Sequence, residues 1–421
     1  MQSKNTTNIL LVVAIGILLF GSGYRLGEFS TRQSSTSFGN QLSVFGSTSE
    51  DVLQNNKNID FSLFWNVWNK IETKYVDKSK VDKQKMYYGA IQGMVASVED
   101  PYTFFLTPDQ NKQSKDDLGG KFEGIGAQLG LKDNRIVVIA PIKDSPAIKA
   151  GVQPGDFILK VNNESVKGWT LTQAVSKIRG EKGTKVSLTL ERNSKEISLD
   201  ITRDQIHVAS VEVTYETNTD CSSNCQTVAN LKLNKFGQTT TDEWETSVRE
   251  IAQKWKNKEI AGMVLDVRYN PGGYLEGAVY IASEFLPKGK VVVKQESTVN
   301  GSKIYNVERE GMLLDIPLTV IINGGSASAS EILAGALRDH NRAKLIGEKS
   351  FGKGSVQEAL DLTNGAGLHV TVAKWILPKG DWIMGKGIEP QIKVTNVIKE
   401  GETLQRADDA QLNKAIEIAT Q

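Results

Sequence analysis

The chain has almost no excess of either charge, and it is poor in histidine and cysteine. Its 421 residues contain 50 Lys and Arg against 49 Asp and Glu, with three His and two Cys. Nucleic-acid binding needs a basic surface, so this balance gives no electrostatic argument for such a partner. No internal repeat is evident. The length is sufficient for two or three globular domains.

The two cysteines, Cys221 and Cys225, stand close together in a polar stretch. If the body of the protein lies outside the cytoplasm, we expect a local disulfide between them. Two free thiols are the alternative. A metal site would need further ligands nearby, and the sequence offers none there.

Long apolar runs are also scarce, and the one that occurs lies at the N-terminus. Residues 9–20 are apolar, with Lys4 before them and Arg25 after them. This is short for a membrane span, but residues 9–24 suffice for a thin bilayer. No A-x-A cleavage site follows, so we predict that residues 1–28 are an uncleaved anchor in the cell membrane. A cleaved signal peptide, giving a secreted or periplasmic protein, is the alternative.

The next part of the chain changes from polar to helical character. Residues 29–58 are rich in Ser, Thr, Asn and Gln, which predicts a flexible linker. Apolar residues at helical spacing over 61–74 and 83–98 predict two amphipathic helices, the second ended by an Asp-Pro pair. We therefore expect a small helical domain over residues 59–113, with its aromatic side chains in a core.

Residues 114–205 have a β-rich pattern. A glycine-led loop at 124–129 runs into a strand, and further strands are predicted at 157–161 and 185–191. A helix is predicted at 172–178 between them. Taken alone, the glycine loop predicts no more than a hairpin.

The most informative segment is a serine-rich turn followed by an isolated lysine. A predicted strand at 318–322 leads into Ser326, Ser328 and Ser330, and a helix begins at Glu331. A serine is a weak nucleophile without a base, and Lys353 lies between two glycines 25 residues after Ser328. A free lysine titrates near 10.4 and acts as a base only when burial lowers its pKa to about 7–8. The alternative is a helix-capping serine and a solvated lysine.

A second turn offers donors for a developing negative charge. The sequence D-V-R-Y-N-P-G-G at 266–273 follows a predicted strand at 263–266, which is preceded by a helix at 241–255 and a strand at 231–233. Its glycines leave a backbone N–H of Gly272 or Gly273 free to face an oxyanion. A plain strand-to-helix turn is the commoner use of such a pattern.

These motifs together resemble the carboxyl-terminal processing proteases, serine peptidases with a Ser-Lys dyad. The matching stretches are D-P-Y-T-F-F-L at 100–106, the turn at 266–273, S-A-S-A-S-E-I at 326–332, F-G-K-G-S-V-Q at 351–357, L-P-K-G at 377–380 and G-K-G-I-E-P at 385–390. The resemblance implies that Ser328 is the nucleophile, Lys353 the general base and Gln357 the residue that orients the lysine. It implies oxyanion donors at Gly272 or Gly273 and at Ala329. Val267 and Gln391 depart from the family pattern, outside the dyad.

The sequence S-P-A-I-K-A-G-V-Q-P-G-D at 145–156 resembles PDZ domains, which bind the terminal carboxylate of a peptide through a glycine-rich loop. The resemblance implies a peptide site at Gly124, Ala127, Gln128 and Leu129. Arg179, at a predicted helix end, is a candidate regulatory link to the protease. Simple charge complementarity at the helix C-terminus is its alternative role.

The family resemblance implies a mixed α/β fold. It would hold a crotonase- or Clp-protease-like peptidase core at 206–400, an inserted PDZ domain, a helical N-terminal domain and a C-terminal helix at 401–421. It implies an endopeptidase that needs no metal or cofactor and acts on polypeptides bound by their C-terminal tails; a homo-oligomer is left open. A membrane-tethered PDZ adaptor with an inactive core is one rival. A hydrolase that uses His340 or His369 is the other, although neither lies in a recognisable triad motif, and no G-x-S-x-G elbow surrounds Ser328.

Overall fold

The computed structural model describes residues 59–119, 121–132, 135–142, 144–169, 171–217, 225–299, 301–397 and 404–421. The predicted anchor, the predicted linker and Cys221 lie outside these residues. The chain divides into two compact units, Met1–Met86 and Tyr87–Gln421. No helix among the described residues is both long and apolar enough to cross a bilayer.

The described part of the first unit is helical. It contains α3 (Ser62–Lys74), the short 3-10 helix η2 (Lys78–Lys80) and the beginning of α4 (Lys83–Ala96). Lys83 forms an ion pair with Glu72 at 2.8 Å. The expectation of an aromatic core is wrong for α3, because this helix buries none of its residues and Trp65 is 55% exposed. Its rings contact one another instead.

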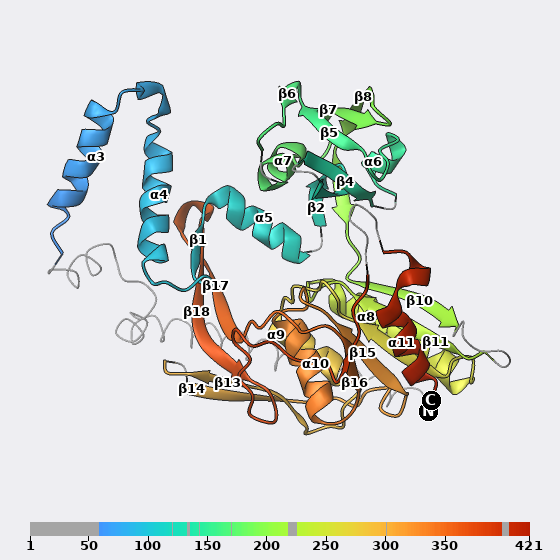
Figure 1. Cartoon of the computed structure of the whole chain (residues 1–421). Helices are drawn as coiled ribbons and strands as arrows, with labels where there is room; N and C mark the ends of the chain where they lie inside the picture. Colours follow the sequence, from blue (N-terminus) through green and yellow to red (C-terminus); the bar gives the residue numbers. More distant parts are fainter. Residues whose placement is uncertain are drawn as a thin grey trace, which may run out of the picture. The chain divides into compact units, whose positions relative to one another are not determined.

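The centre of the second unit is a six-stranded sheet in the order β10-β11-β12-β15-β16-β19 (Figure 1). Only the β10–β11 pair is antiparallel. β12 and β15 are buried along their whole length, as expected of parallel strands covered on both faces. The strand bounds are β10 (Val211–Thr217), β11 (Thr227–Leu233), β12 (Gly262–Asp266), β15 (Leu318–Ile322), β16 (Lys344–Gly347) and β19 (Ile392–Lys393).

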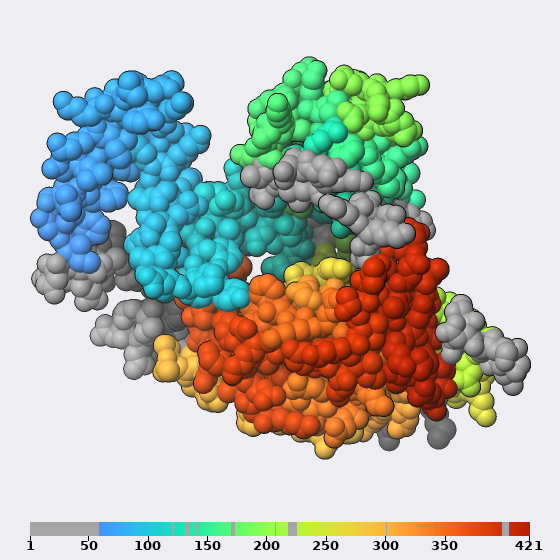
Figure 2. All heavy atoms as spheres, in the orientation of Figure 1, coloured from blue at the N-terminus to red at the C-terminus, as the bar shows by residue number. Residues whose placement is uncertain are grey.

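Helices cover both faces of this sheet. On one face, α8 (Thr240–Lys256), α9 (Leu275–Ala282) and α10 (Ala329–Asp339) share the main hydrophobic core with strand residues such as Leu265. On the other face, α11 (Ala410–Ala419) packs against strand residues such as Val264. Neighbouring strand residues point to opposite faces, so one strand serves both cores. The C-terminal residues, red in Figure 2, border the orange residues that precede them in the chain.

A second sheet runs in the order β1-β18-β13-β14, and β17 pairs with β18. The β13–β14 hairpin and the strand β17 were not predicted from the sequence. β17 places Gln357 opposite Thr371 of β18. The bounds are β1 (Phe104–Leu106), β13 (Val291–Ser297), β14 (Gly301–Asn306), β17 (Ser355–Asp361) and β18 (Gly367–Ile376), with the 3-10 helices η3 (Thr363–Gly365) and η4 (Arg406–Asp408).

The segment that resembles PDZ domains forms its own antiparallel sheet in the order β3-β4-β5-β7-β8, with β6 paired to β5. β3 is therefore an edge strand. β2 and β9 form a separate two-stranded pair that encloses the module in sequence. The bounds are α5 (Pro108–Gly119), β2 (Lys121–Gly124), β3 (Ala127–Lys132), β4 (Arg135–Pro141), α6 (Pro146–Lys149), β5 (Phe157–Val161), β6 (Glu164–Ser165), α7 (Leu171–Ile178), β7 (Lys185–Arg192), β8 (Lys195–Thr202) and β9 (Asp204–His207). The predicted mixed α/β class is confirmed.

Candidate active site

Ser328 lies at the tight turn between β15 and α10 and has a backbone conformation that non-glycine residues rarely adopt. Its φ is 55° and its ψ is −116°. Such a conformation typically costs about 1–3 kcal/mol and persists only where surrounding contacts enforce it. Those contacts include hydrogen bonds to the carbonyl of Asn270 from the Ala327 N–H, at 3.0 Å, and from the Ser330 hydroxyl, at 2.9 Å.

The other two serines of the turn are committed to structure. Ser326 is fully buried and donates its hydroxyl proton to the carbonyl of Val267 at 2.8 Å. Ser330 is also fully buried. Ser328 alone of the three is partly exposed and lines a cavity. The turn therefore presents one serine to a substrate.

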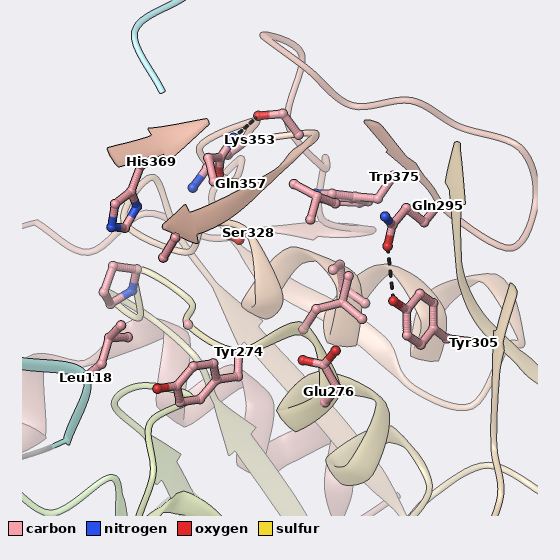
Figure 3. A pocket seen from close by; sticks show the side chains of 17 residues that line it. Leu118, Tyr274, Glu276, Gln295, Tyr305, Ser328, Lys353, Gln357, His369 and Trp375 are labelled. Carbon is pink, nitrogen blue, oxygen red and sulfur yellow. Dashed lines mark hydrogen bonds between the residues drawn. The ribbon is translucent and has the colours of Figure 1, made fainter. Parts of the chain in front are cut away.

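The cavity has a volume of about 340 Å³. Ser328, Lys353, Gln357 and His369 lie around it, and the hydrogen-bonded pair Gln295 and Tyr305 closes another side (Figure 3). The rest of the lining is largely apolar: Leu118, Leu275, Ile332, Val356, Ala359 and Trp375. Residues from separate parts of the chain thus meet at one hollow large enough for a side chain.

Lys353 is partly buried at this cavity. Removal from water lowers the pKa of its amine, and the negative charges of Asp100 and Glu331 partly oppose that effect. The direction is the one that a general base needs. The amine and the Ser328 hydroxyl face the same hollow without a hydrogen bond between them in this structure.

Glu331 connects the serine turn to the lysine loop. Its buried carboxylate accepts the backbone N–H of Ser328 at 2.9 Å and that of Lys353 at 3.0 Å. It also accepts the N–H of Gly352 at 2.7 Å and the hydroxyl of Ser350 at 2.6 Å. From the sequence, Glu331 was expected only to begin a helix. The S-x-x-E spacing of a capping box was the available signal.

Gln357 forms no hydrogen bond with Lys353 in this structure. Its amide nitrogen donates to the hydroxyls of Ser355, at 2.8 Å, and Thr371, at 3.0 Å. Its role as the orienting residue stays a prediction, while its position on the cavity wall agrees with such a role.

The two candidate oxyanion glycines differ in their hydrogen bonds. The N–H of Gly272 donates to the side-chain oxygen of Asn270 at 2.9 Å. Gly273 makes no such donation, and a Cβ placed on it would lie 2.1 Å from the carbonyl oxygen of Phe236. Ala329 occupies the first position of α10, where a backbone N–H has no partner within the helix. Gly273 and Ala329 are therefore the better pair of donors.

The strand before this turn is held by a buried ion cluster that sequence analysis missed. Arg268 donates to Asp266 at 2.6 Å and to Asp409 at 2.8 Å. Asp409 lies just before α11, so the C-terminal segment stabilises the turn that carries the glycines. A single sequence gives no signal for a pair so far apart.

The predicted peptide-binding loop joins β2 to the edge strand β3. Gly126 has a φ of 74°, and a Cβ there would lie 2.4 Å from the Cβ of Ser145, so only glycine fits. Gly124, Ala127, Gln128 and Leu129 flank this point, and the free edge of β3 is available for an added peptide strand. Their role stays a prediction.

Arg179 forms an ion pair with Asp117 of α5 at 3.0 Å, and its guanidinium carbon lies 4.6 Å from the centre of the Phe122 ring. These contacts join the end of α7 to α5 and β2. A partly exposed pair of this kind contributes at most about 1 kcal/mol. The regulatory role of Arg179 is not tested by these contacts.

The remaining candidates are the histidines and the cysteines. His369 lines the cavity and stacks on Phe104, with ring centres 4.7 Å apart; burial, followed by the charge of Lys353, lowers its pKa. His340 contacts the carbonyl of Val291 at 2.7 Å. Cys225 is disulfide-bonded, but Cys221 lies outside the described residues, so their pairing stays a prediction.

Comparison with known families gives three matches along the chain. Residues 227–394 match the peptidase family S41, residues 137–192 match the PDZ domain, and residues 18–110 match the N-terminal domain of the activating protease CtpB.

Individual relatives agree with these matches. The chain is 36% identical over 393 residues to the carboxy-terminal processing protease CtpB of Bacillus subtilis (strain 168), covering 92% of this chain and 77% of that protein. It is 39% identical to a protein named as a CtpA-like serine protease of Staphylococcus aureus (strain COL), covering 84% and 70% of the two chains.

Among solved structures, the photosystem II D1 C-terminal processing protease has 30% identity and a TM-score of 0.51, with 79% of this chain and 92% of that chain covered. An S41 protease structure from Bacteroides fragilis has a TM-score of 0.55 at 17% identity, with 83% and 95% covered, and supports the fold. The chain thus belongs to the carboxy-terminal processing proteases of peptidase family S41, which are serine-type peptidases carrying a PDZ domain.

Proposed function

We propose that the protein is an extracytoplasmic endopeptidase that cleaves polypeptides near their C-terminal tails through a dyad of Ser328 and Lys353. The observation that carries the proposal is their meeting at one cavity, with the lysine amine partly removed from water and its pKa lowered. Gln357 is the candidate for orienting the lysine.

In the first half of the reaction, the neutral Lys353 amine accepts the hydroxyl proton of Ser328, and the Oγ of Ser328 attacks the peptide carbonyl carbon. The carbonyl oxygen becomes an oxyanion beside the N–H groups of Gly273 and Ala329. The protonated lysine then gives its proton to the leaving amine, the C–N bond breaks, and an acyl-enzyme ester forms.

In the second half, Lys353 takes a proton from a water molecule, and the resulting hydroxide attacks the ester carbonyl. The C–O bond to Ser328 breaks, and the serine regains its proton from the lysine. This sequence needs no metal or cofactor. The apolar lining of the cavity favours substrates with an apolar residue before the cleaved bond.

Mass spectrometry of tail peptides tests this proposal. Ser328→Ala and Lys353→Ala should each lower kcat/KM by at least about 10³-fold, while Lys349→Ala, at an exposed lysine four residues away, should retain wild-type cleavage. Equal, negligible cleavage by wild type and Ser328→Ala would instead support the PDZ adaptor. Loss of activity in His369→Ala or His340→Ala but not in Lys353→Ala would support the histidine hydrolase.

Capture of the substrate tail by the PDZ domain is a separate part of the proposal. The free edge of β3 and the loop around Gly126 support a site for an added strand that ends in a carboxylate. Peptides with an amidated C-terminus should bind more weakly than the same peptides with a free carboxylate, as measured by calorimetry on Ser328→Ala. Equal affinity would reject carboxylate capture.

The proposed location is the cell membrane, with residues 1–28 as the anchor and the catalytic body outside the cytoplasm. The apolar run at 9–20 supports it. Membrane fractionation and sequencing of the mature N-terminus distinguish an anchor from a cleaved signal peptide. A homo-oligomer belongs to the same proposal, supported by exposed apolar side chains such as Leu63 and Trp65 on α3, and light scattering measures it.

A further inference from the structure

Asp100 lies in the turn after α4, in a stretch that the proposed mechanism does not use. Its carboxylate is held in place by the turn itself. One oxygen accepts the backbone N–H of Tyr102 at 3.1 Å, and the other accepts the hydroxyl of Thr103 at 2.7 Å. The side chain is partly buried, and it has a defined orientation because both oxygens are bonded.

A chain of hydrogen bonds leads from this carboxylate to the catalytic strands. The Thr103 hydroxyl accepts the backbone N–H of Thr371 at 3.0 Å, and the Thr371 hydroxyl accepts the amide of Gln357 at 3.0 Å. The pairing of β1 with β18, with Phe104 opposite His369, fixes the register of this contact. The turn therefore reaches the cavity wall through Thr103 and Thr371.

The same turn faces the amine of Lys353. The ring centre of Tyr102 lies 5.2 Å from Nζ of Lys353. The charged and titratable groups that face this lysine are Tyr102 and Asp100 from the turn after α4, Glu331 from α10 and His369 from β18. Glu331 already accepts four hydrogen bonds, one of them from the backbone of Lys353 itself. Both carboxylates act on the Lys353 amine through their charge, with Asp100 having the larger effect, whereas Glu331 in addition holds the backbone of the loop.

We propose that Asp100 is a positioning residue of the dyad, which attracts the Lys353 ammonium and sets the fraction of lysine that is neutral and able to accept the serine proton. This inference rests on the proposed role of Lys353 as the base. An opposite charge nearby favours the charged form of an amine, so Asp100 opposes the effect of burial. Removal of the Asp100 charge should increase the neutral fraction at a given pH.

The test uses the pH dependence of kcat/KM for a tail peptide in the full-length protein. The rising limb, where Lys353 loses its proton, should move to lower pH in Asp100→Asn, which keeps the size and acceptor oxygen of the side chain. Asp100→Glu retains the charge and should have a midpoint closer to that of wild type. Glu99→Gln removes the neighbouring exposed carboxylate and should leave the profile unchanged.

A second measurement does not depend on catalysis. Only a neutral amine reacts with acetic anhydride, so the pH dependence of Lys353 acetylation, followed by peptide mass spectrometry in Ser328→Ala, reports the lysine charge directly. The midpoint should fall when Asp100→Asn is added to Ser328→Ala, and it should not fall with Glu99→Gln.

An unchanged acetylation midpoint in Asp100→Asn, or a shift to higher pH, would overturn the inference while leaving the dyad intact. Wild-type cleavage by Lys353→Ala would instead overturn the dyad. If Asp100→Asn does not fold, Asp100→Ser, which also removes the charge, takes its place. An acetylation midpoint below that of wild type would support the inference, and an unchanged or higher midpoint would contradict it.

Discussion

The carboxylate of Glu331 accepts the backbone N–H of Lys353 at 3.0 Å. The same oxygen accepts the N–H of Ser328, so one buried side chain fixes the backbone of both members of the proposed dyad. Two elements that are distant in sequence are thereby held at one cavity. The relative position of Ser328 and Lys353 depends on Glu331.

Glu331→Gln should therefore lower activity more than most neutral substitutions. An amide has one acceptor oxygen, so two of the four donors lose their partner, and each buried unsatisfied donor costs about 1–3 kcal/mol. Misplacement of the dyad by about 1 Å can reduce kcat about 100-fold. Steady-state kinetics and thermal unfolding measure both effects. Glu358→Gln, at an exposed position on β17, should change neither, and a wild-type kcat in Glu331→Gln would refute the role.

The buried amine of Lys353 should reduce the stability of the protein at neutral pH. Its pKa is lowered in the folded state, so the unfolded chain binds the proton more tightly. Wild type therefore loses stability as the pH falls below the unfolded pKa of about 10.4. Lys353→Met lacks this effect, and we expect it to be inactive but more stable by roughly 1 kcal/mol at pH 7.

Thermal unfolding at pH 7 and near pH 10 measures this difference, which should shrink at the higher pH. Lys349→Met, at an exposed lysine, should show no comparable gain. If Lys353→Met is less stable than wild type at pH 7, the lysine stabilises the fold. That result would argue against a lysine whose pKa is lowered by burial.

Gly273 should tolerate no side chain. A Cβ there would lie 2.1 Å from the carbonyl oxygen of Phe236, and the backbone φ is 137°. Gly273→Ala should lose at least about 3 kcal/mol of stability and nearly all activity. Gly289 also has a positive φ, of 86°, but its Cβ would meet open space, so Gly289→Ala should cost only about 1 kcal/mol. Similar costs for the two variants would contradict the proposed close approach.

Because of the ion pair between Arg268 and Asp409, the free energy of unfolding should decrease as the pH falls into the acid range. Burial raises the pKa of Asp409, but the hydrogen bonds and charge of Arg268, together with hydrogen bonds from Leu412 and Asn396, hold the pKa below the ordinary value. The pair therefore stabilises the fold at pH values above the pKa of Asp409 in the unfolded chain, about 3.9. This stabilisation is lost as the pH falls through the pKa of Asp409 in the folded protein. Asp409→Asn should cost about 3 kcal/mol at pH 7 and much less near pH 2.

Denaturant unfolding at the two pH values measures this cost. The adjacent exposed residue offers a matched control, since Asp408→Asn should be neutral at both. Equal destabilisation of Asp409→Asn at pH 7 and pH 2 would show that packing, and not the charge pair, carries the effect.

Local patterns predicted the elements that carry Ser328. The strand at 318–322 coincides with β15, and the predicted helix that begins at Glu331 lies within α10. Strong apolar runs and small-residue turns are local signals, so these elements can be predicted from one sequence. The peptidase family and its PDZ domain were recognised from motifs at fixed spacing, and the comparisons confirm both.

The residues missed by sequence analysis act through contacts between distant segments. Asp409 reaches Arg268 from 141 residues away, and Thr103 reaches Thr371 from 268 residues away. Neither pair has a local signature. Similarly, β17 is half exposed and lacks a strong alternating pattern, so the strand that carries Gln357 was not predicted.

The most direct test of the central claim is detection of the acyl-enzyme on Ser328. A tail peptide ester, which acylates faster than it deacylates, is mixed with the protein and quenched in acid, and peptide mass spectrometry locates the adduct. We expect an ester-linked adduct on Ser328 in wild type and no adduct in Ser328→Ala or Lys353→Ala. Turnover of the peptide with an adduct on another residue, or an undiminished adduct in Lys353→Ala, would contradict this expectation.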